Sequence, residues 1–250
     1  MTPQTLLSHI DSGQLWPSAA ASQPALDLPA AYQQALAVRQ LRVGRGELPR
    51  GYKVGFTNRG IWPLYNVHAP IWGTVWDSIL SFCEGQGELS LDRTCQPRIE
   101  PEVVFGLRAG PRPGCDLGEL FDAVGWMAPG FEIVQSHLPD WKFTAADTIA
   151  DSGLHARLLV GRKRDVREVA TGAQALERKL AAACVTLARE GEAVDEGFGA
   201  NVLDGPLHAL LHFVNELRAC PGAPALQAGD VITTGISRPA DDPLSTWKLA

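Results

Sequence analysis

The spacing of apolar and polar residues changes character near Gly51. Before this point, apolar residues recur at helical intervals around Leu6 and again over residues 30–41. After it come short apolar runs separated by glycine and proline, which are typical of strands. These runs cover residues 51–56, 70–76, 99–107, 130–136, 154–161 and 230–236. The pattern predicts a helical extension over residues 1–48 followed by a β-rich main domain over residues 49–250.

Helical spacing returns between these apolar runs. It predicts further helices over residues 116–126, 171–190 and 206–217. Because helices and strands are mixed rather than strictly alternating, the order argues against a doubly wound sheet. The chain is therefore predicted to adopt an α+β fold around a rolled or sandwiched mixed sheet.

Composition narrows the class of protein. The 250 residues are 45% hydrophobic and 20% charged, with a net charge of −6, as in an ordinary globular protein. Lysine and arginine form no basic block, so we expect no nucleic acid partner. Apolar runs stay well short of the roughly 20 residues that span a bilayer. We therefore expect a cytoplasmic protein that does not contact a membrane.

Several familiar kinds of site are absent from the sequence. The five cysteines are scattered and never spaced as CxxC, which favours reduced thiols over disulfides or a zinc knuckle. His208 and His212 have the spacing of a zinc pair on a helix, but they belong to no HExxH motif and fall on the flank of the predicted apolar stripe. This placement favours surface histidines. No GxSxG, Walker-type or GxGxxG string points to a serine hydrolase, an NTPase or a dinucleotide enzyme.

Glu100 and Glu102 carry the sharpest chemical signal. They lie one residue apart beside an apolar run, and Pro101 between them opposes a helix. On a strand, both side chains point to the same face, roughly 7 Å apart along the chain. Two such carboxylates repel each other unless a cation lies between them, and a hard divalent ion with oxygen ligands satisfies this need. Solvated glutamates on an exposed edge strand are the alternative.

Glu132 adds a third carboxylate. Its neighbours Phe131 and Ile133 place it in an apolar strand, where an unpaired charge is costly. Three acids make a site for Mg²⁺ or Mn²⁺ that leaves coordination positions for water and a bidentate substrate. An ion pair with a nearby lysine or arginine is the alternative for Glu132.

Lys53 is the candidate cationic group of the same site. It alternates with the apolar residues Tyr52 and Val54 and so faces the opposite side of a predicted strand. In a site, such a lysine orients a substrate carboxylate or moves a proton. A surface lysine with its stem on apolar residues is the alternative.

Taken in order, these segments resemble the hydratase and decarboxylase branch of the fumarylacetoacetate hydrolase superfamily. The resemblance covers most of the chain and is carried by the strings GYKVGFT, QPRIEPEVVFGL, GFEIVQSHLPDW, DTIAD and LQAGDVITTGIS. It implies a mixed β-roll as the catalytic domain over residues 49–250. It also implies that Glu100, Glu102 and Glu132 are the metal ligands and that Lys53 is the active-site lysine. Asp77 falls near an acidic position of the family and is a further catalytic candidate.

The resemblance also implies a reaction. The substrate would be a short 2-keto or 2-hydroxydienoate acid, and a bound Mg²⁺ or Mn²⁺ would chelate its C1 carboxylate and C2 oxygen. Lys53 and a second acid or base would move protons along the conjugated chain. We therefore expect a hydro-lyase of the 2-keto-4-pentenoate hydratase kind that acts in the breakdown of aromatic compounds. We expect it to assemble as a homo-oligomer.

The chain departs from the family pattern in two places. Where the family commonly reads aspartate-asparagine-alanine-serine, this chain has Asp151 and Ser152 followed by Gly153, Leu154 and His155. His155 is therefore a candidate acid–base group, with a structural histidine as the alternative. The sequence also stops at Ala250, where the family begins its last strands, and we expect an exposed sheet edge there.

Three other functions compete with the hydratase. Within the superfamily, the alternatives are a 4-oxalocrotonate-type decarboxylase and an acylpyruvate hydrolase. A non-catalytic subunit that pairs with a decarboxylase or hydratase is a further alternative, although the three intact glutamates argue against it. The string DTIAD favours the hydratase.

Overall fold

The computed structural model describes residues 1–17, 26–236 and 247–248. Its helices are α1 (Pro3–Ser12), α2 (Leu28–Gly44), α3 (Trp62–Tyr65), α4 (Leu117–Ala123), α5 (Ala145–Ala150), α6 (Val166–Val169), α7 (Ala173–Ala181) and α8 (Pro206–Ala219). Its strands are β1 (Pro49–Gly55), β2 (Ile71–Trp76), β3 (Leu80–Phe82), β4 (Arg98–Leu107), β5 (Val124–Val134), β6 (His155–Val160), β7 (Arg164–Asp165), β8 (Cys184–Arg189), β9 (Glu192–Phe198), β10 (Val231–Thr233) and β11 (Trp247–Lys248).

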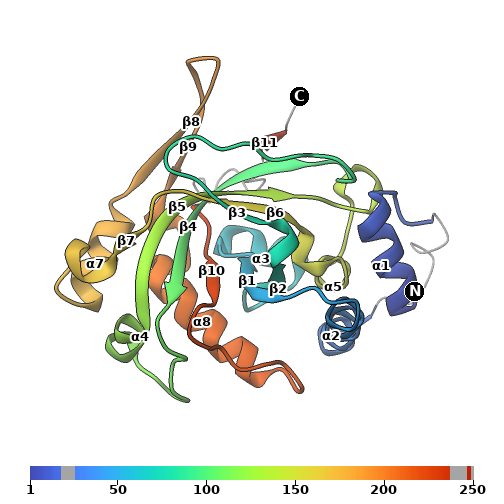
Figure 1. Cartoon of the computed structure of the whole chain (residues 1–250), viewed down its shortest axis with the longest axis horizontal. Helices are drawn as coiled ribbons and strands as arrows, with labels where there is room; N and C mark the ends of the chain where they lie inside the picture. The colour runs from blue at the N-terminus through green and yellow to red at the C-terminus, as the bar shows by residue number, and fades with distance from the viewer. Residues whose placement is uncertain (18–25, 237–246, 249–250) are drawn as a thin grey trace.

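A mixed sheet forms the centre of the molecule (Figure 1). Its main path runs β2-β1-β10-β4-β5-β6-β3, with β1 parallel to β10, β3 parallel to β6, and the other neighbours antiparallel. Strand β2, at one edge, also contacts β6 near the other edge, so the sheet curls. Each of the six apolar runs contains a strand, which confirms the predicted α+β fold with a rolled sheet.

The two faces of the sheet have different partners. On the outside, the side chains of Tyr52, Val103 and Phe105 pack against Leu210 and Phe213 of α8, in the largest apolar cluster of the described residues. Inside the curl, a smaller cluster is formed by Val75, Val104, Ala128, Leu158, Val160 and Val231. Because side chains alternate along each strand, Lys53, Glu100 and Glu102 share this inner face, which is where a site can form.

The N-terminal helices pack against the sheet and its connections. Asp27 accepts a hydrogen bond from the backbone N–H of Ala30 at 2.7 Å and so caps α2. Leu36 of α2 joins the large outer cluster, and α2 also contacts α5. The predicted helices before residue 49 are thus present, while the division into an extension over residues 1–48 and a domain over residues 49–250 stays a prediction.

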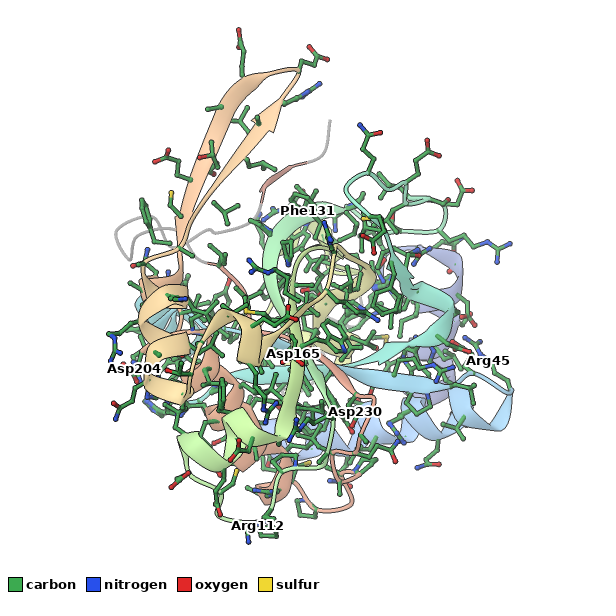
Figure 2. The ribbon with its side chains drawn as sticks, turned by 60° about the vertical axis from the view of Figure 1, so that its left-hand side comes forward. Arg45, Arg112, Phe131, Asp165, Asp204 and Asp230 are labelled. Atoms are coloured by element: carbon green, nitrogen blue, oxygen red, sulfur yellow. The ribbon has the colours of Figure 1, made fainter. Side chains whose placement is uncertain are left out.

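The predicted helix over residues 171–190 is wrong in its second half. Helix α7 ends at Ala181, and residues 184–189 form β8, which pairs with β9 as a hairpin. Val185 and Leu187 are half-buried and alternate with exposed neighbours, which is strand periodicity and could not be separated from the preceding helical pattern. Figures 1 and 2 show this hairpin extending away from the rest of the structure. The predicted helix over residues 116–126 is also shorter, since β5 begins at Val124.

The end of the chain is described only in part. Strand β11 pairs with Arg98 and Ile99 of β4. The expected exposed edge at the end of the sequence otherwise concerns residues outside the described part of the chain. Within the described residues, no helix combines the length and the apolar character that crossing a membrane requires.

Candidate metal centre

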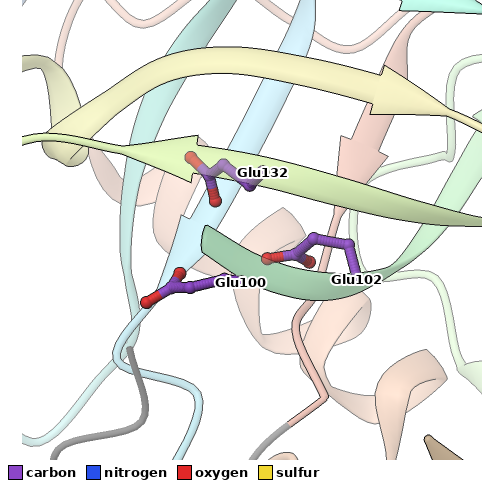
Figure 3. A group of neighbouring side chains, drawn as sticks. All are labelled: Glu100, Glu102 and Glu132. Atoms are coloured by element: carbon purple, nitrogen blue, oxygen red, sulfur yellow. The ribbon is translucent and has the colours of Figure 1, made fainter. Parts of the chain in front are cut away.

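Three glutamates meet inside the curl of the sheet (Figure 3). Glu100 on β4 pairs directly with Glu132 on the antiparallel strand β5, and Glu102 follows two residues later on the same face. One carboxylate oxygen from each residue lies within 4.8 Å of the others. Glu102 and Glu132 are buried, and Glu100 is half-buried. The structure thus brings together the three acids that the strand spacing placed on one face.

The exposed-edge interpretation of Glu100 and Glu102 does not hold, because Glu102 is buried and the segment after β10 bonds this part of β4 on the side opposite β5. Pro101 is tolerated in this central strand because its carbonyl and its nitrogen face the β10 side, where its carbonyl accepts a hydrogen bond from Ile236 N–H. The residue pairs between β10 and β4 extend only to Val104. The missing N–H of Pro101 therefore interrupts no ladder, and the two glutamates keep their extended backbone.

Lys53 reaches the glutamates from β1. Its Nζ lies 3.4 Å from Oε2 of Glu132, and its side chain is only 4% exposed, which excludes the surface alternative. Burial alone would lower the pKa of Lys53, but the charges of Glu132, Glu100 and Glu102 together hold this pKa above its ordinary value. Lys53 is therefore a charged ammonium beside the three acids.

If all three glutamates were ionised, they would carry more negative charge than Lys53 balances. Burial raises the pKa of Glu100 to about 7, with Lys53 lowering it and Glu132 raising it further. Burial, with repulsion from Glu132 and Glu100, also raises the pKa of Glu102 well above its ordinary value. The buried Oε2 of Glu132 accepts no hydrogen bond from the described residues. One ammonium beside three acids, with Oε2 of Glu132 facing that ammonium but accepting no hydrogen bond, is the electrostatic setting that a divalent cation completes.

A cavity of about 210 Å³ opens beside the acids. Glu100, Glu102 and Lys53 line one part of it. Aromatic rings line another part: Tyr65 stacks on Phe56 at 4.7 Å and on Phe143 at 5.5 Å between ring centroids. The cavity thus joins a charged end, suited to a carboxylate and a cation, to an apolar wall suited to a flat unsaturated chain.

Arg98 also lines the cavity, and the sequence patterns did not single it out. Its guanidinium lies 3.9 Å from the ring centroid of Trp141, which is another wall residue. Its position could have been predicted, because Arg98 precedes Glu100 by two residues and so shares the strand face of Glu100 and Glu102. The aromatic wall had no comparable signal, because its rings come from segments far apart in the sequence.

The two remaining candidates differ in position. His155 donates from Nδ1 to Oε1 of Glu132 at 2.6 Å and is buried, so it belongs to the acidic cluster. Burial lowers the pKa of His155, which favours the neutral ring. Asp77 is not among the residues that line the cavity, and its carboxylate accepts hydrogen bonds from the backbone N–H groups of Leu48 and Ser78. The structure does not bring it to the glutamates, and its catalytic role stays a prediction.

The two helical histidines lie away from the cluster. His208 and His212 are on the partly exposed flank of α8, near the carboxylates of Glu177 and Asp204 respectively. Among the described residues, the three glutamates are the group of acids, histidines or cysteines placed to hold a metal ion together. The surface interpretation of both histidines agrees with these positions.

The relatives found among known proteins are hydratases and decarboxylases that act on related acids. The chain is 32% identical over 220 residues to a 2-hydroxyhexa-2,4-dienoate hydratase of Comamonas testosteroni, covering 87% of this chain and 79% of that protein. It is 30% identical to a 2-keto-4-pentenoate hydratase of Burkholderia vietnamiensis and to a 4-oxalocrotonate decarboxylase of a Pseudomonas species. Each of these matches covers 80% of this chain and 72% of the relative. No family model matches the sequence.

Solved structures share the fold. The 4-oxalocrotonate decarboxylase from Pseudomonas putida G7, complexed with magnesium and adipate, superimposes with a TM-score of 0.81 at 23% identity, covering 100% of this chain and 91% of that one. The fumarylpyruvate hydrolase from Pseudomonas aeruginosa, in complex with Mn²⁺ and pyruvate, gives a TM-score of 0.57 at 14% identity, with 81% of each chain covered. Both comparisons show that the fold is shared.

Proposed function

Because this chain belongs to the family of 2-keto-4-pentenoate hydratases and 4-oxalocrotonate decarboxylases, we propose that it is a metal-dependent hydro-lyase. Its substrate is a short 2-hydroxy-2,4-dienoate of the kind formed in the breakdown of aromatic compounds. The observation that carries the proposal is the trio of Glu100, Glu102 and Glu132 inside the sheet, which, once ionised, would outnumber the single positive charge of Lys53. The relatives with hydratase names support water addition as the reaction.

The glutamates would hold Mg²⁺ or Mn²⁺, since hard cations prefer carboxylate oxygens. When bound, the cation supplies a positive charge for the substrate's C1 carboxylate and for the negative charge that develops on its C2 oxygen. Two proteins of the same fold have been solved with these cations, the decarboxylase with magnesium and the fumarylpyruvate hydrolase with Mn²⁺. The unsatisfied oxygen of Glu132 and the excess of acids fit this cation.

The chain's own residues would transfer the protons and contact the unsaturated chain of the substrate. Hydration needs a proton removed from the 2-hydroxyl, a proton delivered to C5, and then water added with its hydroxyl at C4 and its hydrogen at C3. Lys53, charged and in the cavity wall, is placed to donate or stabilise charge in these proton transfers. The rings of Phe56, Tyr65 and Phe143 contact the flat chain and keep bulk water away from it.

A substrate assay tests the proposal. The protein with Mg²⁺ should consume 2-hydroxypenta-2,4-dienoate, followed as loss of the dienol absorbance. Removal of the cation with EDTA should lower the rate by roughly a hundredfold or more, because the charge it stabilises is worth several kcal/mol, and added Mg²⁺ or Mn²⁺ should restore it. The expected product is the 4-hydroxy-2-oxo acid, identified by mass.

Other outcomes of the same assay point to other functions. Release of CO₂ from 4-oxalocrotonate without consumption of the dienoate would identify a decarboxylase, and cleavage of an acylpyruvate would identify the hydrolase. Turnover of none of these, together with a stable complex with a separate hydratase or decarboxylase, would identify a partner subunit. Assembly as a homo-oligomer and a cytoplasmic location belong to the proposal and are tested by light scattering and by cell fractionation.

Metal affinity should depend on pH in a defined direction. The pKa of about 7 at Glu100 means that protons compete with the cation as the pH falls through neutrality. We expect the Mn²⁺ dissociation constant to rise by about tenfold per pH unit below pH 7, and more steeply if Glu102 releases a second proton. Calorimetry in buffers of different ionisation enthalpy measures both the affinity and the protons released. An unchanged dissociation constant between pH 8 and pH 6 would contradict the prediction.

A further inference from the structure

His155 owes its position to an irregularity between two strands. Along β6, Arg157 pairs with Ile133, but the next residue of β5, Val134, pairs with His155 rather than with Ala156. The extra residue in β6 is a bulge, and bulges redirect the side chains beside them. Leu158 points into the curl, so regular alternation would turn His155 to the opposite face. The bulge brings the imidazole to the inner face instead.

The segment before β6 is held by a close backbone contact. A Cβ atom at Gly73 of β2 would lie 2.1 Å from the carbonyl oxygen of Ser152, so only glycine allows this approach. Residues Ser152–Leu154 form a short 3-10 turn that leads directly into His155. His155 is therefore fixed both by the bulge after it and by the turn before it.

The imidazole holds one of the two oxygens of Glu132. Nδ1 of His155 donates to Oε1 at 2.6 Å, while Nζ of Lys53 lies 3.4 Å from Oε2. Glu132 is fully buried and His155 is 3% exposed. A glutamate has three side-chain torsions and needs such contacts to keep one rotamer. With Oε1 held by the histidine, Oε2, which faces Lys53 but accepts no hydrogen bond from the described residues, is the oxygen open to the cation.

His155 itself does not reach the cavity. Glu100, Glu102 and Lys53 line it, whereas neither Glu132 nor His155 does, and His155 bonds Glu132 on the side of Oε1. A group behind a ligand cannot exchange protons with the substrate directly. The sequence left open an acid–base or a structural histidine, and the geometry favours a different role.

We propose that His155 is a positioning residue, which orients Glu132 through the Nδ1–H bond so that its second oxygen faces the cation. This inference rests on the proposed metal site. Removing a residue that holds a ligand in this way commonly changes metal affinity by roughly 10- to 100-fold. The role does not require the ring to change its charge, and this separates it from acid–base catalysis.

Two substitutions test the role. His155→Asn keeps an N–H donor close to the place of Nδ1. His155→Leu removes the donor and fills the space of the ring with an apolar side chain. We expect His155→Leu to weaken Mn²⁺ binding to the metal-stripped protein by roughly 10- to 100-fold, and His155→Asn by no more than about threefold. Calorimetry gives the affinity without any need for turnover. At saturating Mn²⁺, His155→Asn should keep kcat within about threefold of the unsubstituted protein.

His137→Leu is the matched control. His137 is also buried, and its Nδ1 bonds a carboxylate oxygen of Asp151 at 2.6 Å, but neither residue belongs to the glutamate cluster. This control should lower Tm yet leave the Mn²⁺ affinity of the folded protein within about threefold. If His155→Leu does not fold, His155→Ala replaces it in the comparison with His155→Asn.

The outcomes separate this inference from the proposed function. An unsubstituted protein that binds no Mn²⁺ would overturn both. If it binds Mn²⁺ and hydrates the dienoate, equal affinity in His155→Leu would overturn the positioning role alone. The same conclusion follows if His155→Asn binds as weakly as His155→Leu, or if it binds normally but loses kcat by roughly a hundredfold, the sign of an acid–base group.

Discussion

Glu102→Gln is expected to lower kcat for the dienoate by roughly a hundredfold or more without loss of the fold. The amide removes one negative ligand, which weakens the cation and the charge stabilisation that it supplies. The amide oxygen of this variant can still accept the hydrogen bond that Gly235 N–H donates to Oε2 of Glu102, so the local backbone keeps its partner. Initial rates over a range of Mg²⁺ concentrations measure the effect. A variant as active as the unsubstituted protein would remove Glu102 from the site.

The same substitution should stabilise the metal-free protein. A carboxyl whose pKa is raised in the folded state destabilises that state as the pH rises above the unfolded pKa, because ionisation is then easier in the unfolded chain. The Tm of Glu102→Gln without metal should therefore exceed that of the unsubstituted protein at about pH 7, and the difference should shrink as the pH falls toward the unfolded pKa of about 4.3. Glu177→Gln is the control, since Glu177 is also buried but lies outside the cluster, and it should leave Mn²⁺ affinity unchanged.

Lys53→Met should lower kcat and kcat/KM together by roughly 10²–10⁴, the usual contribution of a positioned acid or base. Methionine keeps the apolar stem and deletes only the charge. Mn²⁺ affinity should change little or improve, because the ammonium 3.4 Å from Glu132 opposes a divalent cation. Steady-state kinetics at saturating metal, together with calorimetry, provide both readings.

The matched control for this variant is Lys142→Met. Lys142 is exposed, with 83% of its side chain accessible, and pairs only loosely with Asp140 at 3.7 Å. Its removal should leave kcat unchanged. An unchanged kcat in Lys53→Met with only a raised KM would show that Lys53 binds the substrate equally in the ground and transition states.

The acidic site could be predicted because its signal is local. Glu100 and Glu102 share a face through the two-residue period of a strand, and Pro101 excludes the helical alternative. Glu132 was indicated by the apolar residues on either side of it. These patterns depend on neighbouring residues only, so they survive without knowledge of the tertiary structure.

The rest of the site depends on contacts that local patterns do not contain. The bond from His155 to Glu132 joins residues 23 positions apart through a bulge, and no spacing rule predicts a bulge from these residues. The ring of Tyr65 meets Phe143 only after the sheet has curled. The helical pattern over residues 171–190 failed for a related reason, because pairing with β9 decides the conformation of residues 184–189.

The direct pairing of Glu100 with Glu132 has a consequence for how related sequences can diverge. The connection between β4 and β5, residues 108–123, can gain or lose residues without moving either carboxylate, since the ladder of paired residues fixes their separation. A single insertion or deletion within β5 next to Glu132 would instead turn its side chain to the outer face, because alternation reverses with each residue. Natural length variation around this site should therefore be confined to the connecting segments. Within β4 and β5, the number of residues between each glutamate and the connection should stay constant.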